Sequence, residues 1–118
     1  MTTSPPDEPH AHAEYLWGVA VQEGWVDGPM QLVFCWHADS QRKLLELRDA
    51  LDSTNYVLAR AQEWEIGDGG PLDTFAAGPM REWERWQLES ELLWAQAFAA
   101  QKGVRAGIPK LTTIDCAA

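Results

Sequence analysis

Two early segments of the chain have the alternating pattern of large and small side chains that is typical of strands. They are residues 15–21 (YLWGVAV) and 31–37 (QLVFCWH). The residues between them include Gly24 and Asp27-Gly28-Pro29, which favour turns. We therefore predict an antiparallel hairpin over residues 15–37. Residues 1–13 (MTTSPPDEPHAHA) are poor in large apolar side chains and are predicted to be a disordered arm.

The next segment, residues 41–52, has the periodicity of an amphipathic helix. Leu44, Leu47 and Leu51 recur at helical spacing and form one apolar stripe. The preceding Asp39-Ser40 is a suitable N-cap. We predict a helix that begins after Ser40.

Residues 55–66 (NYVLARAQEWEI) fit either a strand or a continuation of that helix. Ser53-Thr54-Asn55 disfavours a continuous helix, and the β-branched and aromatic content rises after it. We favour a strand and keep the helix as the alternative. Glycine and proline at residues 67–71 predict a loop, and residues 72–76 predict a short returning strand.

The segment 79–101 (PMREWERWQLESELLWAQAFAAQ) predicts a long helix that ends near Gly103. A helical projection gives it two apolar faces, where a surface helix needs one. We expect the tryptophan-bearing face to cover the sheet and the other face to pack on the first helix or the tail. The alternative is that one face meets a partner. The first face holds Trp83, Trp86, Ser90, Leu93, Trp94, Ala97 and Phe98, and the second holds Leu88, Leu92, Ala95 and Ala99.

These elements indicate an α+β fold. We expect a small antiparallel sheet of three to five strands with two helices packed on one face, the second helix being long and rich in tryptophan. A run at residues 111–114 in the C-terminal tail is a candidate edge strand. At 118 residues the chain suits one domain, which we assign to residues 14–118 after the arm of residues 1–13.

Charge adds a functional clue, because the net charge is −9 and the acidic residues are clustered. Residues 1–39 contain six acidic residues and no lysine or arginine, and residues 62–91 contain eight acidic residues beside Arg81 and Arg85. Such a surface repels nucleic acid and anionic membranes and attracts basic proteins. We therefore expect no nucleic-acid or membrane partner. The absence of a basic, apolar leader in residues 1–8 and of a long apolar run favours the cytoplasm.

Candidate chemistry is sparse. Cys35 and His37 would point to the same face of a strand, as metal ligands and nucleophile–base pairs do. One pair does not make a site, so the sequence favours core packing for Cys35 and predicts no metal, no cofactor and no catalytic residue. His10 and His12 are weak metal candidates on the predicted arm. Cys116 and Cys35 are expected to stay reduced.

We therefore hypothesise an acidic, non-enzymatic interaction protein. It would bind a basic protein partner and inhibit or scaffold it, in the manner of phage-encoded inhibitors or immunity proteins that imitate nucleic-acid charge. Homo-oligomerisation is a further use of the same surface. The predicted partner-binding residues lie between residues 64 and 91: Trp64, Asp68, Asp73, Glu82, Trp83, Glu84, Glu89 and Glu91.

Two other hypotheses remain open at this point. One is a small enzyme or ligand-binding domain with an aromatic pocket between the sheet and the long helix, to which Cys35 or His37 would add polarity. The other is an accessory subunit of a larger complex, for which a two-faced helix is suited.

Overall fold

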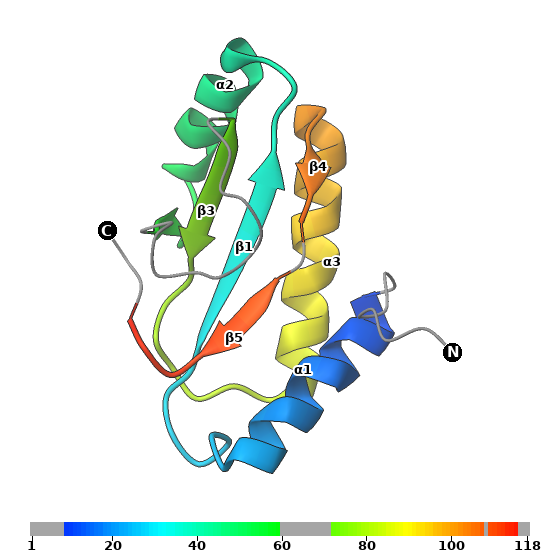
Figure 1. Ribbon diagram of the computed structural model, residues 1–118, viewed down its shortest axis with the longest axis vertical. Coiled ribbons are helices and arrows are strands. Elements are labelled where there is room, and N and C mark those ends of the chain that lie inside the picture. The colour runs from blue at the N-terminus through cyan, green and yellow to red at the C-terminus, as the bar shows by residue number, and fades with distance from the viewer. Residues whose placement is uncertain (1–8, 60–71, 108, 116–118) are drawn as a thin grey trace.

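The computed structural model describes residues 9–59, 72–107 and 109–115, and within them it has an α+β fold (Figure 1). Three helices combine with a five-stranded antiparallel sheet, which confirms the predicted class and sheet. In chain order the elements are α1 (Pro9–Glu23), β1 (Gln31–His37), α2 (Gln41–Leu51), β2 (Val57–Leu58), β3 (Asp73–Ala77), α3 (Arg85–Lys102), β4 (Arg105–Ala106) and β5 (Lys110–Thr112).

Strand β1 is the centre of the sheet. The strand order is β2-β3-β1-β4, and β5 pairs with the same edge of β1 as β4 does, further along it. On the other edge, β3 pairs with β1 in a register that sets Cys35 opposite Phe75 and His37 opposite Asp73. Strand β1 was predicted correctly, and β3 matches the predicted returning strand to within one residue at each end.

The edge formed by β4 and β5 contains one extra residue. Strand β4 pairs Ala106 with Trp36, and continuing that register would place residue 109 opposite Val33. Instead Val33 pairs with Lys110. The extra residue therefore falls between the two short strands, after Ala106 and before Lys110. An insertion of this kind is a β-bulge, which locally interrupts the ladder and often lies beside a functional site.

The predicted hairpin over residues 15–37 is wrong, because residues 9–23 form helix α1. Its buried residues His12, Ala13, Leu16 and Ala20 follow a helical spacing, and α1 packs against α3. Small side chains such as Ala13 and Ala20 let two helices approach closely. Packing on α3 thus overrides the strand propensity of the valines. Residues 9–13 belong to this helix rather than to an arm, and residues 1–8 lie outside the described part.

Helix α3 begins at Arg85, later than the predicted start at Pro79. Glu84 is its N-cap, and a capping box forms because the Glu84 amide donates to Gln87 Oε1 at 2.9 Å while the Glu84 side chain accepts from the backbone of Gln87. The helix ends as predicted at Gly103, whose φ of 68° is the left-handed conformation that glycine adopts readily. Residues 79–84 instead precede the helix, with Arg81 bridged to Met30 and Glu84 in an extended conformation.

The buried face of α3 is mainly the leucine and alanine face. Leu88, Leu92, Ala95 and Ala99 are buried together with Phe98. The expected tryptophan face is divided: Phe98 and the half-buried Trp94 turn toward the sheet, whereas Trp86 and Leu93 are exposed. The expectation that this whole face covers the sheet is therefore wrong.

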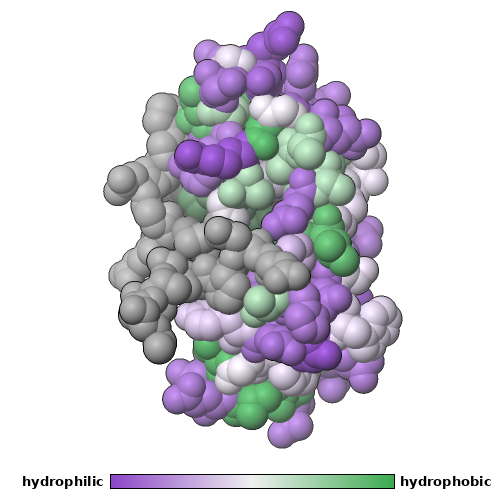
Figure 2. Space-filling view, turned by 90° about the vertical axis from the view of Figure 1, so that its right-hand side faces the viewer, coloured by the Kyte–Doolittle hydropathy of each residue, from purple (hydrophilic) through white to green (hydrophobic). Residues whose placement is uncertain are grey.

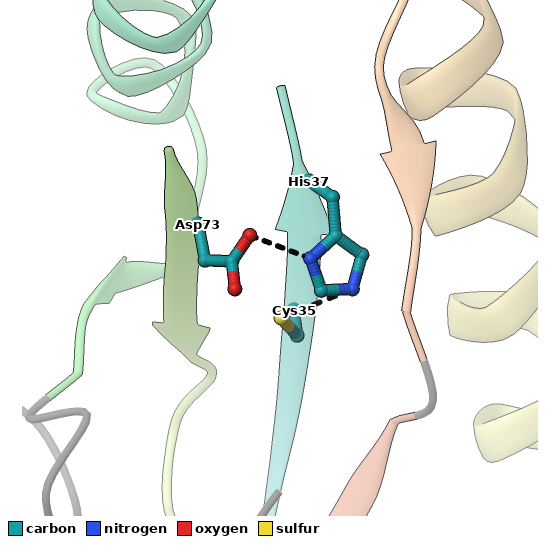
Figure 3. Close-up of side chains that lie close together, drawn as sticks. All are labelled: Cys35, His37 and Asp73. Atoms are coloured by element: carbon teal, nitrogen blue, oxygen red, sulfur yellow. Dashed lines mark hydrogen bonds and ion pairs between the residues drawn. The ribbon is translucent and has the colours of Figure 1, made fainter. Parts of the chain in front are cut away.

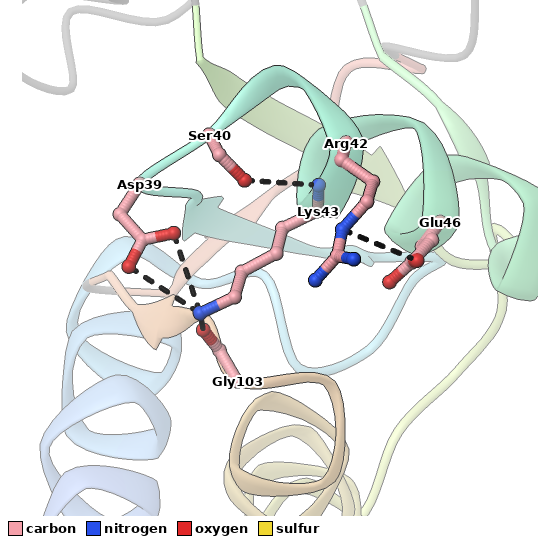
Figure 4. A network of polar contacts seen from close by, with 6 residues as sticks. All are labelled: Asp39, Ser40, Arg42, Lys43, Glu46 and Gly103. Carbon is pink, nitrogen blue, oxygen red and sulfur yellow. Dashed lines mark hydrogen bonds and ion pairs between the residues drawn. The ribbon is translucent and has the colours of Figure 1, made fainter.

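Helix α2 confirms its prediction, with Ser40 as the N-cap accepting from the Lys43 amide at 3.3 Å. The Lys43 ammonium also joins two elements (Figure 4). It pairs with Asp39 at 3.3 Å and donates to the Gly103 carbonyl at 3.1 Å, so it connects the start of α2 to the end of α3. A cation at a helix C-terminus also complements the helix dipole.

The core is divided between the two faces of the sheet. On one face, all three helices contribute to a large cluster around Leu32, Phe34 and Trp36 of β1. The expectation of two covering helices is thus corrected to three. The opposite face carries a small cluster of Val33, Cys35, Phe75 and Ala77.

The remaining predictions concern shorter segments. Strand β2 covers only two residues of the predicted strand 55–66, and residues 60–66 lie outside the described part, as does the predicted loop 67–71. Strand β5 supplies the tail strand, slightly earlier than expected. None of the described helices is both long and apolar enough to cross a membrane.

Candidate functional site

Three polar side chains meet on the sheet face that lies opposite the helix-covered core: Cys35, His37 and Asp73 (Figure 3). Cys35 and His37 lie two residues apart on β1 and therefore point to the same side. Asp73, the first residue of β3, is brought beside His37 by the antiparallel register. The potential ligand atoms of the three residues all lie within 4.8 Å of one another.

The contacts of His37 orient its ring. Asp73 Oδ1 lies 2.6 Å from Nδ1, and Cys35 Sγ lies 3.8 Å from Nε2. A carboxylate accepts hydrogen bonds, so the Asp73 contact favours the tautomer with hydrogen on Nδ1. Nε2 then has its lone pair available on the side of the Cys35 thiol. His37 and Asp73 remain partly accessible, with side-chain exposures of 29% and 17%.

Burial controls the state of the thiol. Desolvation, with a smaller contribution from the nearby charge of Asp73 and against the opposing charge of Arg105, raises the pKa of Cys35 to about 12. Only 3% of Cys35 is exposed. At neutral pH the isolated site therefore contains a thiol rather than a thiolate.

Gly107 is the closest neighbour on the bulged edge. Its amide donates to the Cys35 carbonyl at 2.7 Å. A Cβ atom at this position would lie 2.8 Å from His37 Nε2 and 3.2 Å from Cys35 Cβ. The absence of a side chain at residue 107 therefore leaves the room that His37 occupies.

The arrangement resembles two kinds of chemical site. A thiol, an imidazole base and an orienting carboxylate are the parts of a nucleophilic triad. The same three groups, with the carboxylate behind the imidazole, also support metal binding. A buried thiol with a high pKa is a poor nucleophile, whereas a metal ion displaces the thiol proton when it binds.

The aromatic-pocket hypothesis requires Cys35 or His37 to lie beside the aromatic residues, but the structure places them on the opposite face of the sheet. Phe34, Trp36, Tyr56, Trp94 and Phe98 are in ring contact between the sheet and α3, with centroids 5.0–6.2 Å apart. Cys35 and His37 point away from these rings. The aromatic residues therefore pack as core, without the polar pair that the hypothesis assigned to them.

The predicted partner-binding residues are dispersed. Trp83 is 3% exposed and its Nε1 donates to the Met30 carbonyl at 2.9 Å, so almost none of its side chain is accessible to a partner. Asp73 faces His37 as described above. Trp64 and Asp68 lie outside the described residues, and their predicted role stays a prediction.

The four predicted glutamates fall into two groups. Glu82 and Glu84 are exposed near the start of α3. Glu89 lies 2.5 Å from His10 Nδ1, and this contact raises the pKa of His10. Glu91 accepts from the Tyr56 hydroxyl at 2.8 Å, and burial, followed by this bond, raises the pKa of Tyr56. Glu89 and Glu91 thus help to dock α3 onto its neighbours.

Trp86 and Leu93, which the helical projection placed on the face expected to cover the sheet, are 63% and 53% exposed. They lie seven residues apart, two turns along the outer side of α3. Figure 2 shows the side of the molecule on which α3 and α1 lie, where hydrophobic residues form separate patches among hydrophilic ones. The helical projection could have indicated this exposure, because Leu88 and Leu92 belong to a second apolar face that could be buried instead.

Comparisons of the chain with protein-family models, with curated proteins and with solved structures found no match.

Proposed function

We propose that the protein is an acidic, non-enzymatic interaction protein that binds a basic protein partner through the outer surface of α3. This surface, the outer α3 surface, consists of Glu82, Glu84, Trp86 and Leu93. The observation that supports this proposal most strongly is the exposure of Trp86 beside glutamates in a chain of net charge −9. Binding there would inhibit or scaffold the partner.

Trp86 has the properties of an interface anchor. Its Nε1 donates to Glu84 Oε2 at 2.8 Å, and this bond restrains the large ring while most of it faces solvent. Tryptophan is enriched among the residues that dominate binding energy, because it contributes a large contact area at a small entropic cost. Leu93 extends the apolar contact along the helix.

The local charge favours a basic partner. Arg81 and Arg85 also lie near the start of α3, but Arg81 stacks over the Trp83 ring at 4.8 Å and Arg85 pairs with Glu14 at 3.6 Å. Glu82 and Glu84 are exposed, so negative charge predominates next to Trp86. Complementary charge increases the rate of encounter and the specificity of binding. Cytoplasmic residence, where Cys35 would remain a thiol, completes the proposal.

The test is a capture experiment from a lysate of the native host, read by mass spectrometry. The immobilised wild-type protein is compared with Glu82→Lys/Glu84→Lys and with Trp86→Ser. The matched control changes an exposed apolar residue and an exposed acid on α2, Leu45→Ser with Asp49→Lys. We expect a basic protein that is retained by the wild type and the control and lost from both test variants. Identical capture by all four proteins would contradict the proposal.

Light scattering at several salt concentrations separates a second copy of the chain from a different partner. Like charges on two identical acidic surfaces repel at low salt, so the proposal predicts a monomer there. A dimer that Trp86→Ser dissociates would instead assign the outer α3 surface to self-association.

A further inference from the structure

We propose that Cys35 and His37 form a binding site for a divalent transition metal of the zinc class, with Asp73 as the positioning residue. Cys35 Sγ and His37 Nε2 would be the two protein ligands, and water or a bound molecule would complete the coordination. The site lies on the sheet face away from the helices. It is therefore separate from the outer α3 surface and independent of the proposed function.

The separation of the two donors suits a zinc ion. Zinc–sulfur and zinc–nitrogen bonds of about 2.3 and 2.0–2.1 Å at a tetrahedral angle place the two ligand atoms roughly 3.6 Å apart. Sγ and Nε2 are 3.8 Å apart. An ion between them would need only a small adjustment of the side chains. A thiolate with an imidazole is also the donor pair that zinc and related ions prefer over magnesium or calcium.

Asp73 contacts the ring nitrogen of His37 that would not bind the metal. Metal-binding histidines commonly donate their second ring N–H to a carboxylate, which fixes the tautomer and increases the basicity of the coordinating nitrogen. Asp73 Oδ1 stands 2.6 Å from His37 Nδ1, in the position that this role requires. The carboxylate also adds negative charge near a site that would receive a cation.

Gly107 on the bulged edge leaves the space that the His37 ring occupies. Since a Cβ atom on residue 107 would lie 2.8 Å from Nε2, any residue other than glycine would displace the imidazole. The extra residue between β4 and β5 occurs at this same point. Bulges recur beside functional sites because they terminate pairing locally.

Cobalt(II) titration tests the proposal, because cobalt substitutes for zinc and cobalt–thiolate bonds give an intense charge-transfer absorption. The protein is prepared as Cys116→Ser so that Cys35 is its only thiol. We expect one equivalent of cobalt to give the thiolate band, and one equivalent of zinc to remove it. Cys35→Ala should lose the band, and His37→Ala should weaken binding at least about tenfold. His10→Ala, which changes a histidine on α1, is the matched control and should bind as the parent does.

Three further variants test positioning while both ligands are kept. Asp73→Ala should weaken cobalt binding by about tenfold to a hundredfold with the thiolate band retained at saturation. Asp73→Asn, which still offers an oxygen to Nδ1, should restore part of the affinity. Gly107→Ala should weaken binding because it displaces Nε2. Circular dichroism on every variant verifies that the fold persists.

Three results would overturn the proposal. The first is the absence of a thiolate band in the Cys116→Ser protein at millimolar cobalt. The second is a band or zinc affinity that Cys35→Ala leaves unchanged. The third is equal affinity of the parent and His37→Ala proteins.

Discussion

The two faces of strand β1 differ in what they contribute to the molecule. On the helix-covered face, Leu32 and Trp36 are fully buried and Phe34 is nearly so, within one large aromatic cluster. On the opposite face, Val33 and Cys35 are buried in a small cluster, and His37 extends from it to a carboxylate. One strand thus carries the centre of the main core on one side and two members of the polar triplet on the other.

The two faces of β1 are therefore expected to differ in how much they contribute to the stability of the protein. A large apolar cluster contributes most of the burial free energy of a small domain. A partly exposed hydrogen-bonded triplet contributes little to stability, because water satisfies the same polar groups in the unfolded chain. We therefore expect substitutions on the first face to lower the free energy of unfolding more than substitutions of the polar triplet on the second face.

The largest effect is expected from Trp36→Ala. The side chain is fully buried among aromatic rings, so its removal should lower the free energy of unfolding by about 3–5 kcal/mol. Cys35→Ala on the opposite face should cost on the order of 1 kcal/mol, since it removes a single buried atom. Urea denaturation measures both. Equal losses would show that the two faces do not differ in this way.

The two sides of α3 offer a second comparison, with a slightly smaller effect. Leu88 is fully buried and Leu93 is 53% exposed. Leu88→Ala should lower the free energy of unfolding by about 2–5 kcal/mol, and Leu93→Ala should change it by no more than about 0.5 kcal/mol. The denaturation midpoints of the two variants measure the difference. A large loss in Leu93→Ala would mean that the outer side of α3 is not solvent-exposed.

A third test concerns the hydrogen bond that fastens α3 to the start of β2. Tyr56→Phe removes the donor to Glu91 and should cost about 1–2 kcal/mol, less than a fully buried charged bond because Glu91 is partly exposed. Glu91→Gln retains an acceptor and should cost less. If Tyr56→Phe were neutral in urea denaturation, this bond would not hold α3 in place.

The smallest effect is a pH dependence at the start of α1. The hydrogen bond and charge of Glu89 raise the pKa of His10 above its ordinary value of 6.5. A raised folded-state pKa stabilises α1 fully below pH 6.5, and the effect is lost as pH rises through the folded-state pKa. Hydrogen exchange of the α1 amides, corrected for the intrinsic effect of pH, should show faster opening at higher pH. His10→Ala should remove this trend; a trend that persisted would assign it to another group.

The elements that were predicted correctly are those whose sequence pattern is compatible with only one type of secondary structure. Strand β1, helix α2 with its Ser40 cap, and the end of α3 at Gly103 all combine a periodic apolar pattern with a matching terminal residue. Helix α1 was missed because alternating Tyr15, Trp17 and Val19 imitates a strand. The decisive contact, small residues of α1 against α3, is a tertiary one that no local pattern contains.

The distinction between local patterns and tertiary contacts also explains which site residues could be predicted from the sequence. Sequence placed Cys35 and His37 on one side of a strand, but Asp73 is 36 positions from His37 in the chain. Only the register of β1 and β3 brings it near, so a pair became a triplet without any sequence motif. The outer side of α3 was misjudged for a related reason. Both of its stripes are apolar, and the choice between them depends on which side the sheet and α1 cover.

Zinc-dependent stabilisation is the most direct test of the central claim, that the side of β1 facing away from the three described helices serves chemistry rather than folding. The free energy of unfolding of the Cys116→Ser protein is measured by urea denaturation with and without excess zinc, beside the same protein carrying His37→Ala. A ligand that binds only the folded state at one hundred times its dissociation constant adds about 2.7 kcal/mol. We predict a gain of this order in the parent, little gain in the His37→Ala variant, and similar stability of the two proteins without zinc. A zinc effect that is absent from both proteins or equal in both, or a large loss of stability in zinc-free His37→Ala, would contradict the account.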